Sequence, residues 1–193
     1  MEMSAQCLIE AIQGETNAVM MYHRFAEQAS ADKLPNISKL FRMLAVAEQI
    51  HIKNHRRALG SGRKVPVVIE ALSVQTTEMN ILHAIAGERF ECRTMYPNFF
   101  RKIRKELPNI YAKVAMLSME WSSKVEARHA GQLSRALAFV KRGDDLPSSD
   151  LFLCRVCGNI EFGKPQKECE ICGHDARFFM DMDRTLNAEG EER

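Results

Sequence analysis

Two copies of the motif Glu-x-x-His, Glu48–His51 and Glu126–His129, each lie in the middle of a long amphipathic helical pattern. Residues three apart share one face of a helix, so each motif directs a carboxylate and an imidazole toward the core. Two other helical patterns carry a glutamate on their apolar face, Glu15 in one and Glu88 in the other. Burying so many unpaired carboxylates would strongly destabilise a fold, and a pair of metal ions would remove that cost. The motifs therefore predict a dinuclear metal site enclosed by helices.

Apolar residues at helical spacing predict four long helices that can enclose such a site. The expected helices span about residues 4–30, 35–59, 73–106 and 109–142. Residues 63–72 form a longer connection, which fits a crossover between the second and third helices. Pro97 is expected to kink the third helix or to separate its last turns. The expected fold class is mostly α, with a four-helix bundle over residues 1–142.

A second metal site is predicted after the bundle. Residues 143–150 are polar and rich in turn formers, so we expect a linker there, and the helical period is lost beyond it. Residues 151–182 contain two Cys-x-x-Cys-Gly knuckles, whose thiolates can form a closed tetrahedral site for one iron or one zinc ion. The spacing does not distinguish the two metals. We expect residues 183–193 to be a frayed tail. The four cysteines are Cys154, Cys157, Cys169 and Cys172.

The composition excludes several classes of partner. Hydrophobic residues make up 46% of the chain, charged residues 27%, and the formal net charge is +2, which gives no argument for nucleic acid or an anionic membrane. No segment approaches the roughly 18 uninterrupted apolar residues of a membrane span. The N-terminus leads directly into an amphipathic helix without the pattern of a signal peptide. We therefore expect a cytoplasmic protein without nucleic-acid or membrane partners.

The helical site has one more candidate ligand than a dinuclear site of this kind requires, Glu91. One interpretation is a surface glutamate paired with a nearby arginine; the other is a fifth carboxylate that binds in one redox state only. Two ferrous ions are balanced by four glutamates, so oxidation favours another anion, and the neutral imidazole of His51 could take the same position after reduction. Tyr22 lies seven residues after Glu15 on the same helical face, and Tyr96 lies five residues after Glu91. Each is interpreted either as a hydrogen-bond donor to the carboxylates or as a core residue. His55, one turn after His51, is interpreted as a satisfied core or rim histidine.

These motifs together resemble the rubrerythrin family, in which a ferritin-like di-iron domain is fused to a rubredoxin-like domain; the closely related nigerythrins share this plan. The resemblance covers nearly the whole chain. Its most specific part is Glu88-x-x-Glu91 leading into Met-Tyr-Pro, which ordinary ferritins lack. The matching segments are Gly14-Glu15 with Tyr22, Ala47-Glu-Gln-Ile-His51, Gly87-Glu-Arg-Phe-Glu91, Met95-Tyr-Pro97, Glu126-Ala-Arg-His129 and both cysteine knuckles.

The resemblance implies a role for each ligand. Glu48 and Glu126 would bridge the two irons, and Glu91 and His51 would alternate on the first iron with redox state. Of the remaining ligands, the resemblance implies that the first iron is held by Glu15 and the second by Glu88 and His129.

The resemblance also implies an activity and partners. Members of the family reduce hydrogen peroxide to water at the di-iron site, and the rubredoxin-like iron returns electrons one at a time. The electrons come from NAD(P)H through separate reductases, with a rubredoxin or ferredoxin as donor. Family members are homodimers in which one subunit's rubredoxin-like domain lies near the other subunit's di-iron site. The implied setting is protection against oxidative stress.

Two positions depart from the family pattern, and two other functions stay open. Asn159 stands where an aromatic residue is usual in the first knuckle, and Glu170 stands where proline is usual in the second. Either change could alter the potential or the exposure of the iron. The main alternative function is a ferritin-like iron oxidase or iron store. The other is a regulatory protein whose four cysteines bind zinc as a ribbon.

Overall fold

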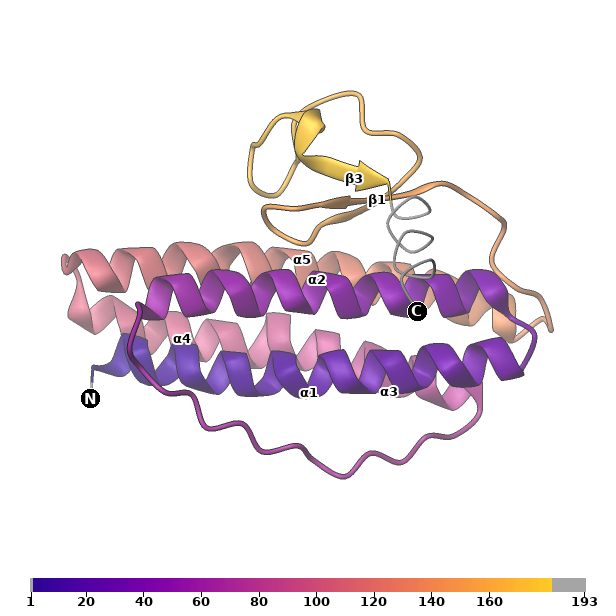
Figure 1. Cartoon of the computed structure of the whole chain (residues 1–193), viewed down its shortest axis with the longest axis horizontal. Helices are drawn as coiled ribbons and strands as arrows, with labels where there is room; N and C mark the ends of the chain where they lie inside the picture. The colour runs from indigo at the N-terminus through magenta and orange to yellow at the C-terminus, as the bar shows by residue number, and fades with distance from the viewer. Residues whose placement is uncertain (1, 182–193) are drawn as a thin grey trace.

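The structure, a computed structural model, describes residues 2–181 and shows a four-helix bundle with a small sheet on one side (Figure 1). The predicted fold class, mostly α with a ferritin-like bundle, is confirmed. The predicted tail at 183–193 lies outside the described residues. The long helical elements are α1 Met3–Ala31, α2 Pro35–Leu59, α3 Thr77–Phe90, α4 Tyr96–Ile103 and α5 Ile110–Val140. Between and after them lie a π-helix Glu91–Met95 and two 3₁₀ turns, Arg104–Glu106 and Ala176–Phe178.

Helix α3 begins later than the sequence pattern predicts. The expected start near residue 73 is wrong, because the helix starts at Thr77 after Thr76, whose side chain accepts a hydrogen bond from the Met79 backbone N–H. The Asn80 side chain also hydrogen-bonds the backbone N–H and carbonyl of Gln75, both at 2.9 Å. These bonds stabilise a non-helical conformation just before the helix, in the way short polar side chains compete with helical bonding.

The π-helix Glu91–Met95 separates α3 from α4 just before Pro97. Its defining bond joins the Tyr96 backbone N–H to the carbonyl of Glu91, five residues earlier. Pro97 has no N–H and its ring crowds the preceding turn, so a local change of helical period can accommodate it. As a result Glu91 and Tyr96 are one π turn apart, and Tyr96 is fully buried. Such segments within α-helices are frequent at functional sites.

The C-terminal part is a three-stranded antiparallel sheet in the order β2-β1-β3. In the register, the central residue Leu153 pairs with Ile160 on one side and Met180 on the other. Leu153 and Ile160 are completely buried. The strands are β1 Leu151–Cys154, β2 Ile160–Phe162 and β3 Phe179–Asp181.

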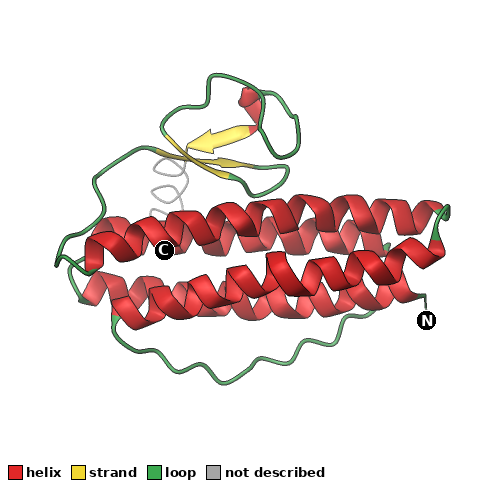
Figure 2. Cartoon of the chain, turned by 180° about the vertical axis from the view of Figure 1, so that it is seen from behind, coloured by secondary structure: helices red, strands yellow, loops and turns green. Residues whose placement is uncertain are grey.

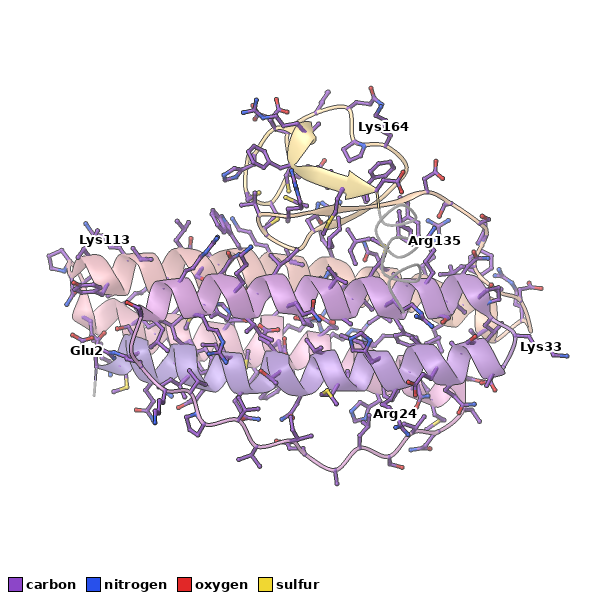
Figure 3. All side chains as sticks on the ribbon, viewed as in Figure 1. Glu2, Arg24, Lys33, Lys113, Arg135 and Lys164 are labelled. Carbon is purple, nitrogen blue, oxygen red and sulfur yellow. The ribbon has the colours of Figure 1, made fainter. Side chains whose placement is uncertain are left out.

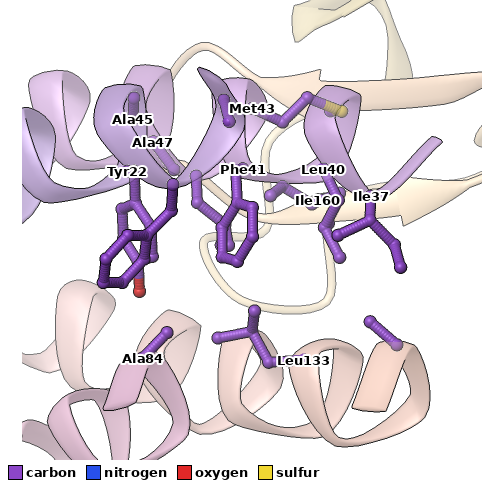
Figure 4. Close-up of a cluster of buried hydrophobic side chains, with 14 of the residues drawn as sticks. Tyr22, Ile37, Leu40, Phe41, Met43, Ala45, Ala47, Ala84, Leu133 and Ile160 are labelled. Atoms are coloured by element: carbon purple, nitrogen blue, oxygen red, sulfur yellow. The ribbon is translucent and has the colours of Figure 1, made fainter. Parts of the chain in front are cut away.

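The segment between α5 and β1 is anchored to the bundle of the same chain. Asp145 accepts hydrogen bonds from the backbone N–H groups of Asn36 (2.8 Å) and Ile37 (3.1 Å), in the first turn of α2. It thereby caps a helix whose own N-cap residue, Leu34, makes no side-chain cap bond. Leu146 next to it is 4% exposed and belongs to a core cluster shared by the bundle and the sheet. Figure 4 shows Ile160 of the sheet in this cluster.

The crossover, residues 60–76, runs along the opposite side of the bundle from the sheet (Figure 2). Two side chains of α1 hold it: the Gln13 amide makes hydrogen bonds of 2.6 and 2.8 Å with the Val68 backbone, and Asn17 accepts from the Glu70 N–H at 3.3 Å. Exposed charged residues labelled in Figure 3, such as Lys33 and Lys113, point away from the core. Within residues 2–181, no helix is long and apolar enough to cross a membrane.

Candidate metal centres

Six side chains from four helices converge in the middle of the bundle. They form two groups whose ligand atoms lie within 4.8 Å of one another. Glu48 and Glu126 belong to both groups, which is the position that a bridging carboxylate occupies between two metal ions. The first group is Glu15, Glu48, His51 and Glu126; the second is Glu48, Glu88, Glu126 and His129. All six side chains are buried.

Several of these ligand atoms have no hydrogen-bond partner among the described residues. They are Glu15 Oε2, Glu88 Oε2, both Glu126 oxygens and both His129 ring nitrogens. Leaving a buried polar group unpaired costs about 1–3 kcal/mol, and more if it is charged. Two cations would satisfy the carboxylate oxygens and one ring nitrogen of His129, and oxygen-rich ligation with one imidazole per metal suits iron or manganese. The residues present therefore fit a di-iron centre.

The electrostatics of the group also favour bound cations. Burial, followed by repulsion from Glu126 and Glu15, raises the pKa of Glu48 well above its ordinary value. Burial acts to lower the pKa of His51, but the surrounding carboxylates raise it well above its usual range. Without metal, protons must offset part of the carboxylate charge. Metal ions replace these protons, so loading the site should release them.

Tyr22 and Tyr96 support the two ends of the ligand group. The Tyr22 hydroxyl donates a hydrogen bond to Glu88 Oε1, and the Tyr96 hydroxyl donates to Glu15 Oε1. Both tyrosines are fully buried, so each orients one oxygen of a glutamate whose other oxygen is unpaired in the described chain. Of the two interpretations of these tyrosines, the bonds favour that of hydrogen-bond donors to the carboxylates over that of core residues alone.

His55 takes part in the same network, although its interpretation as a satisfied core histidine assigns it no role at the site. Its Nδ1 lies 2.8 Å from Ser118 Oγ, and its Nε2 lies 3.1 Å from the Tyr96 hydroxyl. The ring is completely buried and therefore positions Tyr96 against Glu15. In the sequence, only its spacing of one turn from His51 indicated that His55 could take part in the site.

Glu91 lies outside both ligand groups. It is half-buried and lines a pocket of about 440 Å³ between α1, the crossover and α3. Gly14 and Gly87 line the same pocket, and a Cβ added at either would meet nothing within 4 Å. The pocket therefore provides open space at positions 14 and 87, which directly precede the ligands Glu15 and Glu88, and Glu91 lies on its wall.

The four cysteines form the second centre. The Sγ atoms of Cys154 and Cys172 are 3.7 Å apart, and those of Cys157 and Cys169 are 3.6 Å apart. A tetrahedral ion with metal–sulfur bonds of about 2.3 Å requires sulfur–sulfur distances of about 3.8 Å. The cysteines are arranged for one metal ion of this kind.

His51 joins the two centres. Its Nδ1 is 2.9 Å from Glu48 Oε2 and Glu126 Oε1, while its Nε2 is 3.0 Å from the Cys157 carbonyl oxygen. The carbonyl can only accept, so Nε2 carries the hydrogen and Nδ1 is free to bind metal. A Cβ on Gly158 would lie 2.8 Å from Nε2, so this contact needs glycine. The resemblance places such an approach between subunits, whereas here it occurs within one chain.

Comparisons with known proteins agree with this architecture. The family model described as Rubrerythrin matches residues 6–137. Rubrerythrin-2 of Clostridium acetobutylicum is 30% identical over 89% of this chain and 92% of its own length. Nigerythrin of Nitratidesulfovibrio vulgaris is 31% identical, over 84% and 78% respectively. The structure of the fully reduced, all-ferrous state of nigerythrin has a TM-score of 0.81 with 29% identity, covering 92% of this chain and 86% of that one.

Proposed function

Since the chain belongs to the rubrerythrin family, we propose that it is a non-haem di-iron peroxidase that reduces hydrogen peroxide to water. In this proposal the electrons pass through the iron of the four-cysteine centre. The observation that carries the proposal is the His51 ring, which contacts the carboxylate group with one nitrogen and the Cys157 carbonyl with the other. An iron store has no need of such a connection, and a structural zinc site could not use it.

Two ferrous ions at the carboxylate group would supply the two electrons that, with two protons, convert one hydrogen peroxide into two water molecules. The ligands hold these ions, and the hydrogen bonds of Tyr22 and Tyr96 keep Glu88 and Glu15 in fixed orientations. The close pairing of two one-electron donors matters, because a single ferrous ion would release a hydroxyl radical.

We propose that Glu91 and His51 exchange at the ligand group when the redox state changes. His51 lies within the group and Glu91 outside it, which corresponds to the ligand set expected for reduced metals. Oxidation raises the positive charge, so Glu91 then enters as a compensating anion and His51 withdraws.

The pocket that Glu91 lines is suited to a small, neutral substrate. It is lined by Gly14 and Gly87, and the crossover covers it. Hydrogen peroxide needs no charged recognition group and can enter through such a space. The further proposals, from the resemblance, are electron donors linked to NAD(P)H through rubredoxin or ferredoxin, a homodimeric assembly and a cytoplasmic location.

Replacing Glu91 by Ala is expected to slow peroxide turnover at least tenfold while two irons remain in the bundle, since the four glutamates and both histidines are retained. The matched control is Glu70→Ala, which removes a carboxylate from the same pocket but far from any ligand role. Steady-state peroxide consumption and iron content are measured for both variants. Unchanged peroxide turnover in Glu91→Ala would rule out an exchange of Glu91 and His51 at the ligand group.

A further inference from the structure

Asn159, one of the two departures from the family pattern, contacts a sulfur ligand of the four-cysteine centre. Its side chain is completely buried, and its Nδ2 lies 2.8 Å from Glu161 Oε1 and 3.8 Å from Cys169 Sγ. Both neighbours accept hydrogen bonds, so the amide nitrogen and not the oxygen must face them. Its Oδ1 makes no hydrogen bond within residues 2–181.

The second departure, Glu170, belongs to the same network. Arg128 on α5 donates to Glu161 Oε1 at 3.2 Å and to Glu170 Oε2 at 2.6 Å. Arg128 lies inside the second Glu-x-x-His motif, between the ligands Glu126 and His129. A continuous chain of polar contacts therefore runs from the metal-binding helix α5 through Glu161 and Asn159 to a cysteine sulfur.

A buried amide at this position is costly for the fold. An aromatic or aliphatic side chain would fill the space without an unpaired oxygen, whereas the Asn159 Oδ1 loses its water and gains no partner. Residues that leave a buried polar atom unpaired without improving the packing are expected at functional positions. The contact between Nδ2 and Cys169 Sγ is the benefit that the structure offers.

We propose that Asn159 raises the reduction potential of the four-cysteine iron through its N–H···S hydrogen bond to Cys169. Four thiolates give the ferrous site a net charge of −2 and the ferric site −1, so a donor stabilises the ferrous site more. Glu161 works in the opposite direction, because its negative charge disfavours the more anionic ferrous site. Arg128 offsets that charge and fixes the carboxylate as the acceptor that orients the Asn159 amide.

The inference concerns an iron site and deepens the proposed peroxidase function, on which it rests for the direction of electron flow. A higher potential makes the four-cysteine iron easier for a donor to reduce. It also keeps the electron there until the di-iron centre has been oxidised. Asn159 is thus a positioning and tuning residue, since it does not touch peroxide.

The test is a spectroelectrochemical titration of the full iron-loaded chain, which follows the red colour of the ferric four-cysteine site. Asn159→Leu is expected to lower the potential, shifting the one-electron equilibrium about threefold to tenfold toward the ferric form; tenfold corresponds to about 59 mV. Glu161→Gln is expected to raise the potential, because it removes the negative charge and keeps a side-chain oxygen that accepts from the Asn159 amide. Gln166→Leu, which removes an exposed amide from the same part of the chain, should leave it unchanged.

An unaltered potential in Asn159→Leu with the ferric spectrum intact would overturn the inference. So would a shift of Asn159→Leu and Glu161→Gln in the same direction, because disturbed packing has no reason to give opposite signs. If Asn159→Leu fails to hold iron, Asn159→Ala, which removes the same donor and adds no bulk, takes its place: a lowered potential supports the inference and an unchanged one overturns it. Peroxide reduction by the unaltered chain is measured separately: a chain with the expected shifts but no peroxidase activity refutes the proposed function and leaves the inference standing.

Discussion

Replacing Glu126 by Ala is expected to remove both irons from the helical bundle while the four-cysteine iron stays bound. Glu126 belongs to both ligand groups, and its oxygens lie 2.9 Å from His51 Nδ1 and 3.0 Å from His129 Nδ1. Neither oxygen has a hydrogen-bond partner within the described chain. Changing a residue that only orients a ligand lowers metal affinity by about 10–100-fold, so losing a bridging ligand should lower it more.

The measurement is the iron content of anaerobically loaded protein after removal of free metal. The four-cysteine iron serves as an internal standard for folded chain. Glu120→Ala, a half-buried glutamate on the same helix outside both ligand groups, is the matched control and should keep all three irons. If Glu126→Ala retained two irons in the bundle, the assignment of the ligands would be wrong.

Replacing Cys157 by Ser is expected to spare the first reaction of fully reduced protein with peroxide and to block its re-reduction. The di-iron ligands are untouched by this change, so the stored electrons can still reach peroxide. The four-cysteine iron, however, loses one of its thiolates, and the contact of that residue's carbonyl with His51 no longer leads to an active electron carrier.

A single-turnover experiment followed by addition of electron donor separates these two steps. Cys92→Ser is the matched control, because Cys92 is a half-buried cysteine outside both metal groups whose thiol bonds the Arg89 carbonyl, a bond that serine can keep. The control should be oxidised and re-reduced like the unaltered protein. Normal re-reduction of Cys157→Ser would show that electrons bypass the four-cysteine centre.

The parts of the fold that follow from short-range rules could be predicted from the sequence. The helices predicted at about 35–59 and 109–142 have ends close to those of α2 and α5, where Pro35 stands in the first turn and Asn109 is the cap. The start of α3 and the π-helix before Pro97 could not be predicted, since both depend on side-chain bonds and on a local change of helical period. The anchoring of the linker by Asp145 also escaped prediction, because it joins residues 109 positions apart.

The same distinction holds for the candidate site. The helical spacing of the glutamates and histidines identified all six side chains that the structure groups together. It could not reveal the partners His55 and Arg128, because their roles depend on which neighbouring element packs against them. Nor could it show that Cys157 approaches His51 within one chain, since the linker composition does not specify the side of the bundle on which the sheet lies.

The proposed peroxidase function requires that the reduced di-iron centre react preferentially with hydrogen peroxide. Anaerobic stopped-flow mixing of fully reduced protein with peroxide, and separately with oxygen, tests it most directly. We expect peroxide to oxidise the di-iron centre much faster than oxygen does, and oxidation of the four-cysteine iron to follow. Oxidation by peroxide that is no faster than oxidation by oxygen would contradict the account and favour an iron oxidase.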